Sequence, residues 1–168
     1  REIYFRSAAE HGAPDRSMLI LDKYPLHTMI AGLLHRVFPQ ARFVLALRHP
    51  CDAVLSCFMQ EFRLNNGMAN FCTLADTVAM YTRTMDLWQM YRDQLPLNVH
   101  TIRYEDVVDD FDGQVQSLCG FLGVDWNPDL RTFDARAPDR GRIRTPSYEQ
   151  VSQPIYRRAR YRWERYRK

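Results

Sequence analysis

The sequence predicts an α/β domain built around a central parallel sheet. Two runs are continuously apolar, residues 18–21 (MLIL) and residues 43–47 (FVLAL), as is typical of strands buried on both faces. Apolar residues at helical spacing lie between them, and this strand-helix-strand order indicates a parallel crossover. The 168 residues are 46% hydrophobic and 26% charged, enough to bury a core of their own. We therefore expect one α/β domain over residues 1–168, a three-layer sandwich with helices on both faces of the sheet.

Helices are predicted after each of the first two strands. The first begins at Pro25, which suits a first helical position, and ends before Pro39. The second begins at Pro50 and the third, the longest, runs from Leu74 to beyond Trp88. The apolar positions that define these three helices recur every three or four residues: Leu26, Met29, Ile30, Leu33, Leu34 and Val37; Ala53, Val54, Cys57 and Phe58; Leu74, Val78, Tyr81, Met85 and Trp88.

From residue 98 onward, the sequence predicts a strand, a helix and a long irregular segment. Residues 98–103 (NVHTIR) alternate weakly and are expected to form a third strand. A helix follows from about Asp110 and ends at Gly123. Residues 127–153 have little periodicity, as functional loops often do, and residues 156–167 return to a helical pattern.

Charge and cysteine content narrow the class of protein. The formal net charge is +3, and seven basic residues against Glu164 gather after Pro154. This tail favours a solvated helix face over a nucleic-acid or membrane surface. The four cysteines have no C-x-x-C spacing, which favours reduced thiols and a cytoplasmic protein. We predict no membrane span and no signal peptide, and the absence of an initial methionine leads us to expect an upstream segment.

Common catalytic and metal-binding signatures are missing from the sequence. It has no G-x-x-x-x-G-K-[ST], G-x-G-x-x-G, G-x-S-x-G or H-E-x-x-H motif, and its five histidines have no partners at ligand spacing. No metal cofactor is therefore expected. Polar sets instead follow each predicted strand, at residues 22–25, 48–56 and 103–106, where open parallel sheets bind their ligands.

Arg48 and Ser56 form the most informative of these sets. An arginine at a strand end and a hydroxyl on the second turn of the next helix can bind one phosphate group together. The alternative is structural: Arg48 pairs with Asp52 to cap the helix, and Ser56 only fits a close contact. Spacing alone leaves both readings open.

Four motifs, in the same order along the chain as in a known family, resemble that family. They are residues 23–26 (KYPL), residues 38–58 (FPQARFVLALRHPCDAVLSCF), residues 103–108 (RYEDVV), and residues 144–156 (RTPSYEQVSQPIY) followed by Arg162 and Trp163. Together they resemble the sulfotransferases that use 3′-phosphoadenosine-5′-phosphosulfate (PAPS), especially the bacterial tetratricopeptide-linked branch and the related tyrosylprotein sulfotransferases. The resemblance implies the P-loop nucleotide-hydrolase-like sulfotransferase fold, and upstream tetratricopeptide repeats in the full-length protein.

The resemblance implies a role for each matching residue. Arg48 and Ser56 match the pair that binds the 3′-phosphate, and Tyr104 matches a tyrosine that contacts the nucleotide. Lys23 matches the catalytic lysine at the transferring sulfuryl group. Further matches lie near the C-terminus. Ser147 matches the serine beside the bridging oxygen, and Arg162 matches a basic residue that reaches the phosphates. The loop over the adenosine is matched by Ser147, Gln150, Val151 and Tyr156.

Two departures from the family pattern limit what is expected of this chain alone. The glycine-, serine- and threonine-rich loop that holds the 5′-phosphosulfate would lie upstream of Arg1, so we expect an N-terminally incomplete domain that binds the donor but does not transfer. The general base would also lie upstream. Gln60 stands where tyrosylprotein relatives carry a basic residue, which weakens the case for a protein-tyrosine acceptor.

The leading interpretation is a PAPS-dependent enzyme that transfers a sulfuryl group to a hydroxyl or amine acceptor without a metal. The alternatives are a non-catalytic 3′-phosphoadenosine-binding module and a nucleotide-kinase-like protein. Binding of nucleic acid by the arginine-rich tail is not favoured, because Trp163 at the family spacing is expected to pack against the sheet.

Overall fold

The computed structural model describes residues 1–10, 19–132 and 155–167. The chain divides into two compact units, and each is described by itself. The first unit comprises Arg1–Arg42 and Arg83–Asn98, and the second comprises Phe43–Thr82 and Val99–Lys168. The long helix α4 (Leu74–Gln94) contributes residues to both units.

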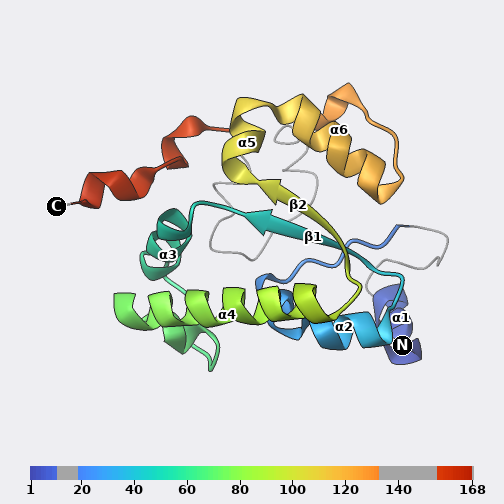
Figure 1. Cartoon of the computed structure of the whole chain (residues 1–168), viewed down its shortest axis with the longest axis horizontal. Helices are drawn as coiled ribbons and strands as arrows, with labels where there is room; N and C mark the ends of the chain where they lie inside the picture. Colours follow the sequence, from blue (N-terminus) through green and yellow to red (C-terminus); the bar gives the residue numbers. More distant parts are fainter. Residues whose placement is uncertain (11–18, 133–154, 168) are drawn as a thin grey trace. The chain divides into compact units, whose positions relative to one another are not determined.

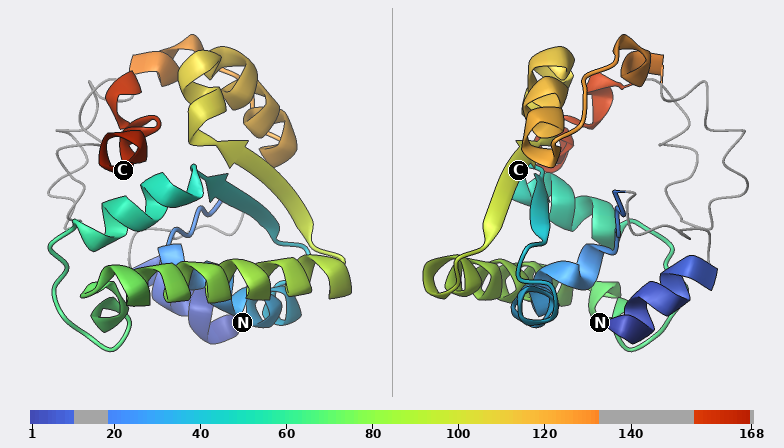
Figure 2. Two further views of the ribbon diagram at one scale, coloured as in Figure 1. Left: turned by 60° about the vertical axis from the view of Figure 1, so that its left-hand side comes forward. Right: turned by 90° about the vertical axis from the view of Figure 1, so that its right-hand side faces the viewer.

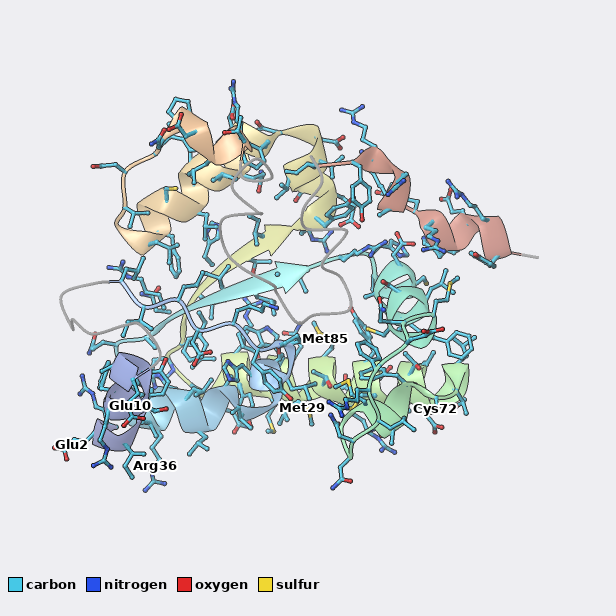
Figure 3. All side chains as sticks on the ribbon, turned by 180° about the vertical axis from the view of Figure 1, so that it is seen from behind. Glu2, Glu10, Met29, Arg36, Cys72 and Met85 are labelled. Atoms are coloured by element: carbon cyan, nitrogen blue, oxygen red, sulfur yellow. The ribbon has the colours of Figure 1, made fainter. Side chains whose placement is uncertain are left out.

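The first unit is helical. It contains α1 (Glu2–Glu10), the 3₁₀ helix η1 (Pro25–Ile30) and α2 (Ala31–Val37), so the helix predicted after Pro25 is confirmed but starts as a 3₁₀ turn. Tyr4 and Phe5 of α1 pack edge-on against Phe38, with ring centroids 5.0 and 5.8 Å away. Glu2 and Glu10 on α1 and Arg36 on α2, all labelled in Figure 3, are exposed.

Close contact between α2 and the end of α4 forms the core of the first unit. Ala31 and Trp88 are almost fully buried there. A Cβ atom added at Gly32 would lie only 2.7 Å from Cε1 of Tyr91, so glycine permits this approach. The Tyr91 hydroxyl also donates to the Met29 carbonyl at 3.1 Å.

The prediction of a strand at residues 18–21 is wrong for residues 19–21, which the structure describes. Residues 19–24 form neither helix nor strand, and Met18 lies outside the described residues. Leu19 and Leu21 are 56% and 75% exposed. An extended segment becomes a strand only where its backbone pairs with a neighbour, and within 19–132 only β1 and β2 pair. An apolar run without a paired backbone stays irregular.

The second unit contains the sheet. Strands β1 (Arg42–Leu47) and β2 (Asn98–Arg103) are neighbours and run in the same direction (Figure 1), as predicted. Helix α3 (Pro50–Phe58) follows β1, and α5 (Tyr104–Asp109), which was not predicted as a separate helix, follows β2. The buried residues of this unit include Leu45 on β1 and Val54 on α3.

Three further elements complete the described part of the second unit up to residue 132. These are η2 (Met68–Phe71), α6 (Phe111–Leu122) and η3 (Pro128–Thr132). The Asp110 side chain caps α6 by accepting from the Gly113 N–H at 3.0 Å. Gly123 ends the helix with a φ of 67°, as predicted, because glycine adopts this left-handed conformation without strain.

The helix predicted over residues 156–167 is wrong. Two short 3₁₀ helices, η5 (Arg157–Ala159) and η6 (Arg162–Tyr166), occupy the segment instead. Tyr161 between them has a φ of 52°, which interrupts any continuous helix. We call residues 155–167 the C-terminal segment. It lies beside α3 in every view (Figures 1 and 2).

Candidate functional site

Arg48 and Tyr104 each come directly after the end of a strand. Arg48 follows Leu47, the last residue of β1, and Tyr104 follows Arg103, the last residue of β2. Because the strands are parallel, both residues lie at the same edge of the sheet. The Arg48 guanidinium carbon lies 5.4 Å from the centroid of the Tyr104 ring, within range of a cation–π interaction. The structure thus brings together two of the predicted site residues, and their predicted roles in binding stay predictions.

The C-terminal segment fixes the orientation of Arg48. Its Nη2 donates to the Ala159 carbonyl at 2.5 Å, a contact between residues 111 positions apart. Its Nε is buried and has no hydrogen-bond partner in the described ranges. A buried donor without an acceptor is costly, and guanidinium N–H groups suit the oxygens of a phosphate or sulfate. Arg48 therefore offers an unused donor to an anion.

Tyr104 also contacts the C-terminal segment. Its hydroxyl donates to the Tyr156 carbonyl at 2.5 Å. Burial, followed by the charge interaction with Tyr156, raises the pKa of the Tyr104 hydroxyl above 10.0, and the Arg48 charge opposes this shift. A tyrosine hydroxyl is protonated near neutral pH and so acts as a donor, and the raised pKa extends this state to more alkaline pH.

A buried carboxyl group on α5 holds the turn that follows β1. Glu105 is 7% exposed, and its Oε1 accepts from the backbone N–H of His49 at 2.9 Å. The His49 ring stacks on Trp163 with centroids 5.1 Å apart and planes 11° apart, and its edge meets Tyr161. The residue after Arg48 is thus fixed from two elements.

Asp52 in the first turn of α3 contacts the C-terminal segment as well. It is 1% exposed, and its Oδ1 accepts from the backbone N–H of Trp163 at 2.8 Å. In the structural alternative considered above, Asp52 would pair with Arg48. In the structure, Asp52 accepts instead from the Trp163 N–H, and Arg48 donates to the Ala159 carbonyl.

Ser56 and Arg162 lie along α3 and beside its end. Ser56 is half-buried on the second turn of the helix. Nη2 of Arg162 lies 3.8 Å from Sδ of Met59, the residue that caps α3. Burial raises the pKa of the neighbouring Cys57 thiol, and the Arg48 charge opposes the shift. The predicted residues Arg48, Ser56, Tyr104, Tyr156 and Arg162 all belong to the second unit, along α3, the two strand ends and the C-terminal segment.

The other predicted site residues lie in the first unit or outside the described residues. Lys23 is exposed in the irregular segment 19–24 of the first unit. Ser147, Gln150 and Val151 lie outside the described residues. Their predicted roles stay predictions.

Sequence reasoning gave no positioning role to His49, Asp52 or Glu105. The only signal available was their place in the polar sets after the strands, at positions where a helix begins. Their burial and their partners, up to 111 residues away, come from the folded chain. We refer to Arg48, Ser56 and Tyr104, with the residues His49, Asp52 and Glu105 around them, as the strand-end site.

The strand-end site has the chemistry of an anion-binding site in an α/β protein. It combines an arginine with a buried unused donor, an aromatic face and the first turn of α3. Within residues 1–10, 19–132 and 155–167, no three His, Cys, Asp or Glu side chains gather as metal ligands would. No helix in those same ranges is long and apolar enough to cross a bilayer.

The chain belongs to the sulfotransferase family, whose model matches residues 1–128. The predicted family is confirmed; its tyrosylprotein branch stays a prediction. A solved sulfotransferase domain from the curacin biosynthetic pathway is similar to this chain with a TM-score of 0.63 and 21% identity, covering 97% of this chain and 60% of that one. The predicted α/β sulfotransferase fold is thereby confirmed.

Two curated relatives are similar over most of the chain. An uncharacterized protein of Aquifex aeolicus is 23% identical over 154 residues, which are 89% of this chain and 19% of that protein. The omega-hydroxy-beta-dihydromenaquinone-9 sulfotransferase Stf3 of Mycobacterium bovis is 26% identical over 161 residues, again 89% of this chain and 38% of the relative. The chain thus spans well under half the length of both. Membership in this family favours the sulfotransferase interpretation over the nucleotide-kinase-like alternative.

Proposed function

We propose that the strand-end site binds the 3′-phosphate of PAPS and that the protein serves sulfuryl transfer to a hydroxyl acceptor. The observation that carries this proposal is Arg48, fixed by Ala159 and Tyr104 with a buried Nε donor still unused. Arg48 and Ser56 lie eight residues apart, at the strand end and on the second turn of α3, and this spacing supports the proposal that both bind one phosphate.

The neighbouring residues suit a nucleotide in the same place. The Tyr104 ring and the backbone around Tyr156 supply apolar surface and a carbonyl next to Arg48. Arg162 adds a second positive charge beside the end of α3. In the proposed complex, Arg48 and Ser56 hold the 3′-phosphate, and Arg162 reaches a phosphate from the C-terminal segment.

The proposed reaction breaks the bond between the sulfuryl sulfur and the bridging oxygen of the donor and forms a bond to the acceptor oxygen. The acceptor loses its proton to a base, and negative charge develops on the departing phosphate. A fixed cation at that oxygen lowers the barrier, and we assign this task to Lys23. We assign Ser147 to the same bridging oxygen of the donor. Gln150 and Val151 are assigned to the loop over the adenosine.

The acceptor is proposed only as a class. Stf3, a relative, is named for a hydroxylated menaquinone derivative, so a hydroxyl on an apolar carrier is one candidate. A protein tyrosine is a weaker one, because Gln60 replaces the basic residue of tyrosylprotein relatives. Both candidates have a hydroxyl oxygen that can act as the nucleophile in sulfuryl transfer.

Calorimetry with adenosine 3′,5′-bisphosphate and AMP tests the donor assignment, because only the first has a 3′-phosphate. Loss of a hydrogen bond to a charged group costs about 1.5–3 kcal/mol, so Arg48→Ala should raise the Kd of the bisphosphate roughly 10- to 150-fold. The Kd of AMP should change far less. Arg92→Ala, which removes an exposed arginine of α4, is the matched control.

Equal affinity of wild type and Arg48→Ala for the bisphosphate would contradict the assignment. An equal loss for AMP would also contradict it, since AMP does not reach a 3′-phosphate site. Tight, 3′-selective binding without any labelled sulfate transfer, in every polypeptide that extends this chain, would favour the non-catalytic binding module instead.

A further inference from the structure

Three contacts fasten the C-terminal segment to the start of α3. Nη2 of Arg48 donates to the Ala159 carbonyl, the His49 ring stacks on Trp163, and the Trp163 backbone N–H donates to Asp52. All three join residues of the second unit that lie more than 100 positions apart. They connect one short stretch, residues 48–52, to one short stretch, residues 159–163.

Asp52 is the most buried member of this set. At 1% exposure it cannot exchange Trp163 for water without moving the segment. Its other oxygen, Oδ2, is buried and has no hydrogen-bond partner within the described residues. Among those residues, the carboxyl group therefore accepts its hydrogen bond from Trp163. Leaving both oxygens without a donor would carry the full penalty of a buried polar group.

The position of Arg48 depends on where the C-terminal segment lies. The Ala159 carbonyl holds one guanidinium nitrogen, which leaves Nε as the unused donor. Ala159 is four residues from Trp163, and only Arg160, Tyr161 and Arg162 separate them. If Trp163 is released, the C-terminal segment keeps its contacts at Tyr156 and Arg160, but the Ala159 carbonyl between them is held less firmly opposite Arg48, and this loosens the orientation of the guanidinium.

We propose that Asp52 is a positioning residue: by holding the Trp163 backbone N–H, it keeps the C-terminal segment in place and so orients Arg48 for a 3′-phosphate. Asp52 touches no ligand in this scheme. It acts through Trp163 and Ala159, and it sets selectivity for the 3′-phosphate more than affinity for the rest of a nucleotide. The proposal rests on the proposed function for the identity of that phosphate.

Two matched pairs of variants isolate the backbone contact. Asp52→Asn keeps an oxygen that can accept from Trp163, and Asp52→Ala does not. Trp163→Ala and Trp163→Pro both lack the ring that stacks on His49, but only proline also lacks the N–H. Position 163 is the second residue of η6, where proline fits a helix start. Asp125→Ala, at an exposed aspartate of the second unit, is the control.

The readout is the ratio of the Kd for AMP to the Kd for adenosine 3′,5′-bisphosphate, with thermal unfolding measured on the same samples. We expect Asp52→Ala and Trp163→Pro to lower this ratio by about tenfold relative to Asp52→Asn and Trp163→Ala, because a charged contact is misplaced. Asp125→Ala should leave the ratio unchanged. Should Asp52→Ala not fold, the Trp163 pair alone decides the question.

An unchanged ratio in folded Trp163→Pro, or an equal fall in Asp52→Asn and Asp52→Ala, would overturn the proposal. Failure of the proposed function is distinguishable, because wild type would then show no preference for the bisphosphate at all. Hydrogen exchange tests the anchor without ligand: the Trp163 amide should exchange about tenfold faster or more in Asp52→Ala and stay protected in Asp52→Asn.

Discussion

The segment around Lys23 and the segment around Arg48 both place a basic residue just after an apolar run, yet the chain holds the two residues differently. Arg48 follows a paired strand, contacts Tyr104 and Ala159, and is half-buried. Lys23 follows an irregular, exposed segment. The difference shows that an apolar run orients the charged residue after it only where the backbone of the run is paired.

The largest difference between the two segments is expected in their contributions to the free energy of unfolding. Leu45 on β1 is 8% exposed and Leu21 is 75% exposed. Truncating a buried leucine costs about 2–5 kcal/mol, whereas exposed positions change stability by roughly 0.5 kcal/mol or less. Leu45→Ala should therefore lower the free energy of unfolding far more than Leu21→Ala, as measured by urea denaturation. Similar losses for both variants would mean that residues 19–21 are packed as a strand would be.

A catalytic assay should distinguish Lys23 from Arg48. It requires a polypeptide that contains this segment and transfers sulfate from the donor at a measurable rate. If Lys23 stabilises charge formed in the transition state, Lys23→Ala should lower kcat by about 10²- to 10³-fold. The Kd of adenosine 3′,5′-bisphosphate should change little, in contrast to Arg48→Ala. A lower melting temperature with kcat unchanged would instead make Lys23 a structural residue.

The sequence predicted the elements that local pattern decides. The run FVLAL, the proline at position 50 and Gly123 predicted β1, the start of α3 and the end of α6. It failed where distant contacts decide. Residues 19–21 pair with no strand among the described residues, and the Trp163 backbone N–H donates to Asp52 and not to a carbonyl of a continuous helix. Spacing likewise pointed to Arg48 and Ser56, but buried partners such as Glu105 emerge only in three dimensions.

A smaller effect is expected at Glu105, which holds the turn after Arg48. Glu105→Ala leaves the His49 N–H without its acceptor and should cost about 1–3 kcal/mol in unfolding free energy. Glu105→Gln keeps an acceptor oxygen and should recover most of that loss. If alanine and glutamine behave alike in denaturation curves, the hydrogen bond to His49 does not stabilise the turn.

The smallest effect concerns pH. Because the pKa of Tyr104 is raised above 10.0 in the folded chain, its contribution to stability is fully present below pH 10 and is lost as pH rises through the folded pKa. The difference in unfolding free energy between wild type and Tyr104→Phe should therefore shrink between about pH 10 and about pH 12. A difference that stays constant or grows over this range would contradict the raised pKa.

A crystal structure of the chain with adenosine 3′,5′-bisphosphate tests the central claim most directly. The account predicts 3′-phosphate oxygens about 2.7–3.1 Å from Arg48 and from the Ser56 hydroxyl, with Ala159 and Trp163 still holding the C-terminal segment beside α3. A 3′-phosphate bound away from both residues, with Arg48 left on the Ala159 carbonyl alone, would contradict the strand-end site as the place where the donor is held.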